Sequence, residues 1–137
     1  MPAVEALLDS NVLVYALPRS LEEPAKQARA RELIATTQFG LSFQVFQEVF
    51  VTATRKLAVP LAPEAALRFL VPFLEFPFVD GTAGLFREAV RLSVRFQVHY
   101  YDAAILAAAR ELGATVVYSE DMADGQSYDG VTVVNPF

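Results

Sequence analysis

The sequence contains no cysteine, and its only histidine is His99. Disulfides, cysteine nucleophiles and thiolate-bound metals are therefore excluded, because all of them need cysteine sulfur. Any bound metal must be held by carboxylates or by His99. Carboxylate oxygens favour hard cations, so Mg²⁺ or Mn²⁺ is the ion that this composition predicts.

Long apolar runs are also missing. No stretch reaches the roughly 18 apolar residues that a membrane-spanning helix needs. The N-terminal segment MPAVEALLDSN carries Glu5 and Asp9 and lacks the basic region with which a signal peptide begins. The sequence therefore predicts a cytoplasmic protein with no membrane span.

An excess of positive charge is absent as well. The net charge is −5, which argues at first against a polyanionic substrate, because nucleic-acid-binding proteins usually carry a basic balance. If four of the 16 Asp and Glu residues bind metal, however, the others nearly balance the 11 Lys and Arg residues. Net charge alone therefore does not decide the substrate.

Apolar side chains are abundant. They make up 54% of the 137 residues, against 20% charged residues. This length and composition predict one folded domain over residues 1–137, with a buried core. The apolar content also exceeds what a lone monomer needs. It therefore predicts a homodimer or another protein partner, and some of the 11 phenylalanines would line that contact.

Strand-like and helix-like patterns alternate along the chain. Predicted strands cover residues 4–8, 39–43, 76–79, 114–118 and 131–134. Predicted helices cover residues 12–17 with Asn11 as a possible cap, 22–36, 44–57, 63–74 with a bend or end at Pro72, 81–97, and 101–112 closed by Gly113. This alternation predicts an α/β fold, a three-layer α/β/α sandwich with a central parallel sheet.

Four acids stand where a buried or half-buried carboxylate is unexpected. Asp9 ends the first strand, Glu48 lies among apolar residues of a helix, Asp102 begins a helix and Asp121 follows a late strand. Function in doubly wound sheets collects at the carboxyl ends of the strands, where Asp9 and Asp121 are expected. Isolated buried carboxylates cost several kcal/mol, and a shared divalent metal would offset that cost.

Each acid has a plainer explanation when it is taken alone. Asp9 and Asp102 could each be the N-terminal cap of the helix that follows. Glu48 alone is more typical of a solvated helix residue, and Asp121 of an ordinary turn. The set of four is much more specific than any single member.

The four acids occur in the order typical of PIN domains. That family carries an Asp at the end of the first strand, a Glu on an early helix, an Asp opening a late helix and an Asp just after the next strand. The matching motifs are LLDSN, QVFQEVF, HYYDAAILAAARELGATVVYSEDM and GQSYDGVTVVNPF. Over essentially its whole length the chain resembles the VapC-type toxins of bacterial toxin–antitoxin pairs.

This resemblance implies a metal-dependent endoribonuclease held in check by a cognate antitoxin protein. Asp9, Glu48, Asp102 and Asp121 would bind one or two Mg²⁺ or Mn²⁺ ions, which activate a water for attack on an RNA phosphodiester. Asn11 and Ser119 would orient these ligands through hydrogen bonds, unless Asn11 is only a helix cap. Glu120 and Asp124 are further acids in the same loop and candidates for outer ligands.

Basic and imidazole side chains offer further candidates. Arg87, Arg91 and Arg95 recur at every fourth position and so share one helical face, which could form a rim for RNA or for an antitoxin. A solvated helix face is the plainer explanation of this pattern. His99 lies three residues before Asp102, and we interpret it as a loop residue in preference to a general base.

Two other functions match part of this sequence pattern. A haloacid-dehalogenase-like phosphohydrolase also places an Asp after the first strand of a doubly wound sheet. That family needs a second Asp two positions later, where this chain has Asn11. A non-catalytic binding module on a PIN-like fold is the other alternative, and the presence of all four acids argues against it.

Overall fold

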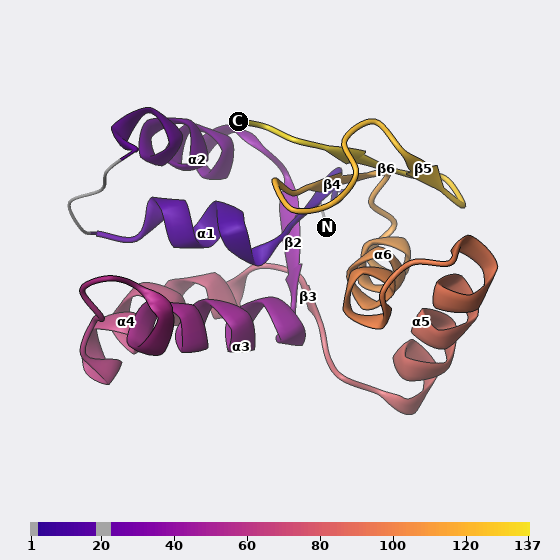
Figure 1. Cartoon of the computed structure of the whole chain (residues 1–137), viewed down its shortest axis with the longest axis horizontal. Coiled ribbons are helices and arrows are strands. Elements are labelled where there is room, and N and C mark those ends of the chain that lie inside the picture. Colours follow the sequence, from indigo (N-terminus) through magenta and orange to yellow (C-terminus); the bar gives the residue numbers. More distant parts are fainter. Residues whose placement is uncertain (1–2, 19–22) are drawn as a thin grey trace.

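A six-stranded sheet with the order β3-β2-β1-β4-β6-β5 forms the centre of the computed structural model, which describes residues 3–18 and 23–137 (Figure 1). The strands are β1 (Ala6–Leu8), β2 (Phe39–Ser42), β3 (Phe78–Val79), β4 (Val116–Tyr118), β5 (Ser127–Tyr128) and β6 (Val131–Val134). All neighbouring strands are parallel except β5 and β6, which pair antiparallel. The predicted central parallel sheet is therefore confirmed, with one antiparallel strand at its edge.

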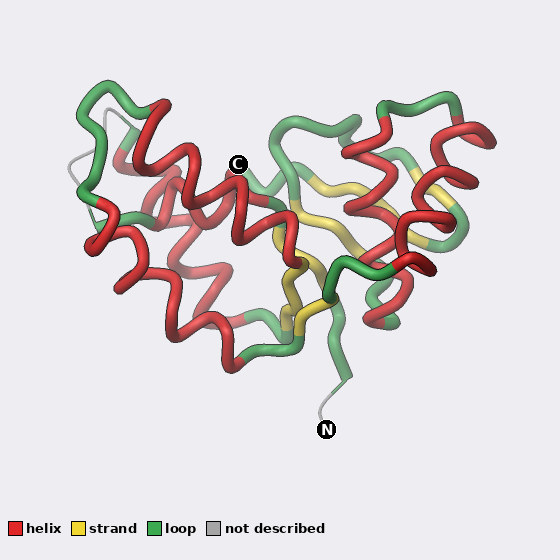
Figure 2. The backbone as a smooth tube through the Cα atoms, turned by 90° about the horizontal axis from the view of Figure 1, so that it is seen from below, coloured by secondary structure: helices red, strands yellow, loops and turns green. Residues whose placement is uncertain are grey.

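Helices cover both faces of this sheet. They are α1 (Ser10–Ala16), α2 (Pro24–Thr36), α3 (Phe43–Val51), α4 (Pro63–Leu70), α5 (Ala83–Phe96) and α6 (Tyr100–Leu112), with a π-helical turn at Thr52–Lys56 and a 3₁₀ turn at Val71–Glu75. Helices α1 to α4 lie on one side of the strands, and α5 and α6 lie on the other (Figure 2). The predicted three-layer sandwich is confirmed.

The core explains why β1 and α6 occupy the middle of the molecule. All three residues of β1 are buried, and α6 is buried continuously from Ala103 to Ala109. Small alanine side chains let this helix approach the sheet closely. Gly40 in β2 serves the same approach, since a Cβ at this position would lie 2.8 Å from Leu112 Cδ1. None of the described helices is long and apolar enough to cross a membrane.

Several boundaries differ from those predicted. Asn11 is not the cap of the first helix, because Asp9 is the N-cap and its side chain accepts a hydrogen bond from Ser10 N. The cap of α6 is His99, not Asp102. The expected start of the second helix at residue 22 lies outside the described residues, and α2 is described from Pro24. The short strand β5 was missed, since two residues carry no detectable periodicity.

One carboxylate ties the turn between β5 and β6 to helices α5 and α6. Asp129 forms ion pairs with Arg91 at 3.0 Å, Arg95 at 2.6 Å and Arg110 at 2.7 Å. The hydrogen bond from Arg91, more than any other contact, holds the pKa of Asp129 below its usual value. Two arginines of the predicted rim are therefore neutralised within the fold, whereas Arg87 forms no ion pair in the described part of the chain.

Substitution Asp129→Asn is expected to lower the melting temperature at pH 7 by a few degrees. Asn tolerates the left-handed backbone at this position, where φ is 50°. The drop in melting temperature therefore measures the loss of the carboxylate charge and not backbone strain. Because the folded-state pKa is lowered, the stabilisation is complete above the ordinary value of 3.8 and is lost as the pH falls through the folded-state pKa.

Thermal unfolding followed by circular dichroism at pH 7 and at pH 3 checks this prediction. The difference between the wild type and Asp129→Asn should shrink at pH 3. The exposed Asp80 forms no ion pair with the described residues, so Asp80→Asn is a matched control with little effect at either pH. A difference that is equally large at pH 3 and pH 7 would contradict the assigned cause.

Candidate metal and nuclease site

Strand pairing brings Asp9 and Ser119 together at the carboxyl end of the sheet. Leu8 and Tyr118 are partners in the parallel ladder of β1 and β4, so the residues that follow them are neighbours. The Ser119 hydroxyl donates a hydrogen bond of 2.8 Å to Asp9 Oδ2, and Ser10 N donates one of 2.8 Å to Oδ1. Asp9 is only 7% exposed. Both of its carboxylate oxygens are thereby oriented.

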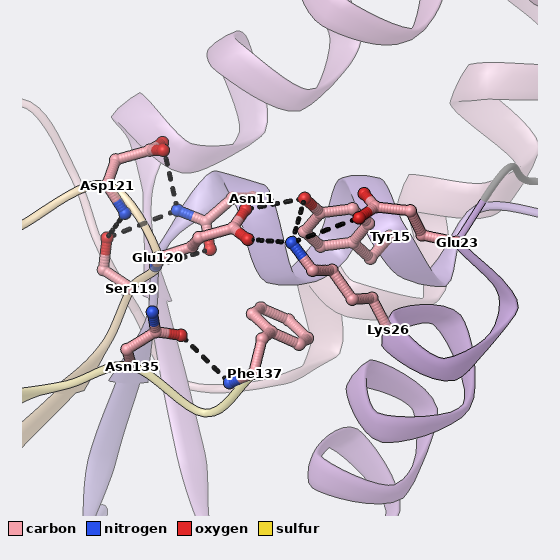
Figure 3. A network of polar contacts seen from close by, with 9 residues as sticks. All are labelled: Asn11, Tyr15, Glu23, Lys26, Ser119, Glu120, Asp121, Asn135 and Phe137. Atoms are coloured by element: carbon pink, nitrogen blue, oxygen red, sulfur yellow. Dashed lines mark hydrogen bonds and ion pairs between the residues drawn. The ribbon is translucent and has the colours of Figure 1, made fainter.

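Asn11 and Ser119 connect Asp9 to Asp121. Figure 3 shows the part of this network that joins Asn11, Ser119 and Asp121. The Asn11 amide donates to Ser119 Oγ and to Asp121 Oδ2, both at 3.3 Å. The backbone N–H groups of Glu120 and Asp121 donate to Asn11 Oδ1 at 3.2 Å and to Ser119 Oγ at 3.2 Å. The structure thus brings together the two acids and the two polar residues that the sequence singled out at the ends of β1 and β4.

Glu48 on α3 and Asp102 on α6 interact electrostatically with the acids at the ends of β1 and β4. Burial is the main cause that raises the pKa of Asp9, Glu48 and Asp102 above their usual values. Mutual repulsion adds to it. The charges of Asp121 and Asp102 raise the pKa of Asp9, and the charges of Asp9 and Asp102 raise that of Glu48. Each of the four carboxylates therefore interacts electrostatically with at least two of the others.

The side chains of Asp9, Glu48, Asp102 and Asp121 are not arranged as a complete metal-binding site. In residues 3–18 and 23–137, no three His, Asp or Glu side chains converge closely enough to hold a metal ion. The chemistry of the donors nevertheless fits a hard divalent cation. All are oxygen donors, three have raised pKa values, and none forms an ion pair with a Lys or Arg of the described residues. A cation would relieve their repulsion.

The remaining acids and the histidine of this region have other contacts. Glu120 is bound by Lys26 and Tyr15. Asp124 accepts a hydrogen bond of 2.8 Å from the backbone N–H of Asn135. The imidazole of His99 accepts one from Tyr101 N and lowers the pKa of Asp102. The suggested role of Glu120 and Asp124 as outer ligands gains no support from these contacts.

Sequence reasoning missed three residues beside the site. Gln44 on α3 lowers the pKa of Glu48 through a side-chain hydrogen bond, and its amide donates to the backbone carbonyl of Tyr101 at 3.2 Å. Tyr15 and Lys26 hold Glu120. Tyr15 follows Asn11 by four positions, so it shares a helix face with it, and this was the one local signal available.

The fold and the site together define the class of this protein. It is a largely parallel α/β sandwich that carries acidic side chains at the carboxyl ends of its central strands β1 and β4. The family model of the PIN domain matches residues 6–123. The chain therefore belongs to the PIN domain family. A search of curated proteins found no significant match.

Solved structures share this fold over nearly the whole chain. A toxin–antitoxin complex from Klebsiella pneumoniae is 20% identical with a TM-score of 0.72, covering 97% of this chain and 98% of that one. VapC20 of Mycobacterium tuberculosis, described as a toxin that cleaves the sarcin–ricin loop, is 19% identical with a TM-score of 0.67 and coverages of 85% and 90%. VapBC2 from Rickettsia felis, bound to a DNA fragment from its promoter, is 15% identical with a TM-score of 0.64 and coverages of 95% and 97%.

Proposed function

We propose that this chain is a divalent-metal-dependent endoribonuclease and the toxin of a VapBC-like toxin–antitoxin pair, acting on RNA in the cytoplasm. The observation that carries the proposal is Asp9, a buried carboxylate with a raised pKa and no cationic partner in the described part of the chain, which interacts with three further carboxylates. Membership of the PIN family and the likeness in fold to toxins support the same conclusion.

Each residue of the site has a role in this proposal. Asp9, Glu48, Asp102 and Asp121 would hold Mg²⁺ or Mn²⁺, and Ser119 and Asn11 orient Asp9 and Asp121 through the hydrogen bonds described above. When bound, such an ion supplies Lewis acidity toward a phosphate and a water of lowered pKa. Asp121 is exposed and Asp102 is partly exposed, so RNA can approach these two carboxylates.

Apolar surface on two helices offers a place for the antitoxin. A groove of about 420 Å³ lies between α3 and α4. Five of its apolar side chains are between 36% and 55% exposed: Phe43, Phe50, Leu67, Val71 and Leu74. An amphipathic helix of the antitoxin would cover such a groove with its apolar face. Phe86, Val90 and Val94 form a second exposed stripe on α5, which we assign to a homodimer contact.

Expression of the chain in a bacterial host is expected to arrest growth and to fragment RNA. Asp121→Ala should abolish both effects and leave the fold intact, because Asp121 is exposed and its carboxylate accepts a hydrogen bond only from Asn11 among the described residues. Growth curves and gel analysis of extracted RNA measure the outcome. Co-expression of the small open reading frame next to the gene should relieve the arrest.

A control variant tests whether the removal of any acidic side chain would lower toxicity. Glu64→Gln changes an exposed acid in the first turn of α4, a helix that supplies none of the four acids, and should remain toxic. A toxic, fully active Asp121→Ala variant would overturn the assigned site. Growth arrest without RNA cleavage would favour the non-catalytic binding module.

A further inference from the structure

Glu120 stands between two residues of the site, but its side chain turns away from them. Figure 3 shows Ser119 and Asp121 beside Asn11, whereas the Glu120 carboxylate points toward Tyr15 and Lys26. The Tyr15 hydroxyl donates a hydrogen bond of 2.6 Å to Glu120 Oε2. The Lys26 ammonium forms an ion pair with Glu120 Oε1 and donates to the Tyr15 hydroxyl at 3.4 Å. Two helices thus hold one carboxylate.

This contact is partly shielded from solvent and anchored on both sides. The side chains of Lys26 and Glu120 are 30% and 24% exposed. Lys26 also lies over the ring of Tyr15, at 5.2 Å from its centroid, and pairs with Glu23 at 3.4 Å. The Tyr15 ring packs edge-on against Phe137, with 4.9 Å between the centroids. Tyr15 therefore cannot move without disturbing its apolar neighbours.

A continuous set of hydrogen bonds leads from Lys26 to Asp9. Lys26 holds the Glu120 side chain, and the Glu120 backbone N–H donates to Asn11 Oδ1. That bond fixes the Asn11 amide, which then donates to Ser119 and to Asp121. Ser119 in turn donates to Asp9. Loop segments are mobile unless they are tied down, and residues 119–121 form such a segment after β4.

We propose that Lys26 and Tyr15 are positioning residues of the site. They hold Glu120 so that Asn11, Ser119 and Asp121 stay aligned and a fifth carboxylate stays away from the other four. This inference rests on the proposed function. Without the Lys26 contact, the Glu120 side chain can turn toward the other acids, and the loop that carries Asp121 loses its anchor. Helix α2 supplies none of the four acids, yet through Lys26 it controls the geometry of the site.

Lys26→Met removes the ammonium and keeps the apolar stem, so it tests the proposal directly. Calorimetric titration of the RNA-free protein with Mn²⁺ should show a dissociation constant raised about tenfold, the lower end of what such supporting contacts contribute. The kcat for RNA should fall by a similar factor while KM stays unchanged. Lys26→Arg should restore both values to within about twofold of the wild type, because the guanidinium can also pair with Glu120. Tyr15→Phe should show the same effects in weaker form.

Arg29→Met separates positioning from the general docking of α2. Arg29 on the same helix donates from Nε to the backbone carbonyl of Pro136 at 3.0 Å and pairs with Glu32 at 3.1 Å, and neither bond involves residues 119–121. This variant should lose as much thermal stability as Lys26→Met while its Mn²⁺ affinity is unchanged. Equal losses of affinity in both variants, or wild-type affinity in Lys26→Met, would overturn the positioning role alone. A wild-type protein that binds no Mn²⁺ would overturn the proposed function as well.

Discussion

Asp9→Asn is expected to reduce RNA cleavage by about a hundredfold or more, since the removal of one group that stabilises developing charge commonly costs this much. The change removes the most buried acid of the site and keeps its size. Gel-based cleavage of a labelled RNA in Mg²⁺ or Mn²⁺, with and without EDTA, measures the loss. Asp102→Asn should be similarly inactive.

The fold of Asp9→Asn should survive. Asn loses one of the two hydrogen bonds that the carboxylate accepts, but it also removes a charge that burial disfavours, as the raised pKa of Asp9 indicates. We therefore expect a melting temperature within a few degrees of that of the metal-free wild type. Cleavage by Asp9→Asn at the wild-type rate would exclude Asp9 from the chemistry. Phosphate release from a small phosphomonoester, with RNA left intact, would favour the phosphohydrolase.

Divalent metal is expected to stabilise the EDTA-treated wild-type protein strongly. A ligand at a hundred times its dissociation constant adds about 2.7 kcal/mol of stability, which for a domain of this size corresponds to a rise in melting temperature of roughly 10 °C. Differential scanning fluorimetry in Mg²⁺ and in Mn²⁺ measures the rise. Asp9→Asn should show little or none of it.

This stabilisation should depend on pH in a defined direction. The pKa values of Asp9, Glu48 and Asp102 are raised in the folded protein, so protons compete with the metal and the rise in melting temperature should shrink on acidification. In metal-free protein these groups contribute the opposite trend. Their protonated forms favour folding below the ordinary pKa values, and this contribution is lost as the pH rises through the folded-state values. An unchanged rise at low pH would argue against carboxylate ligands.

Local patterns in the sequence were sufficient for the order of all elements except the two-residue strand β5. Buried strands such as β1, where every residue is apolar, and amphipathic helices such as α5 are set by periodicity that lies within a few residues. Turn chemistry also acts locally, so Pro63 at the start of α4 and Gly113 after α6 were predictable. The caps were harder, because Asp9 and Asn11 are equally good cap residues and lie two positions apart.

The sequence by itself determined the α/β alternation, the placing of Asp9 and Asp121 after strands, and the absence of any sulfur ligand. Only the tertiary structure decided which side chains meet. The bonds from Ser119 to Asp9 and from Lys26 to Glu120 join residues 110 and 94 positions apart, and the second one turns Glu120 from a candidate ligand into a partner of α2. Contacts over such separations depend on strand register and helix packing, and these arise from the whole buried core rather than from any local spacing.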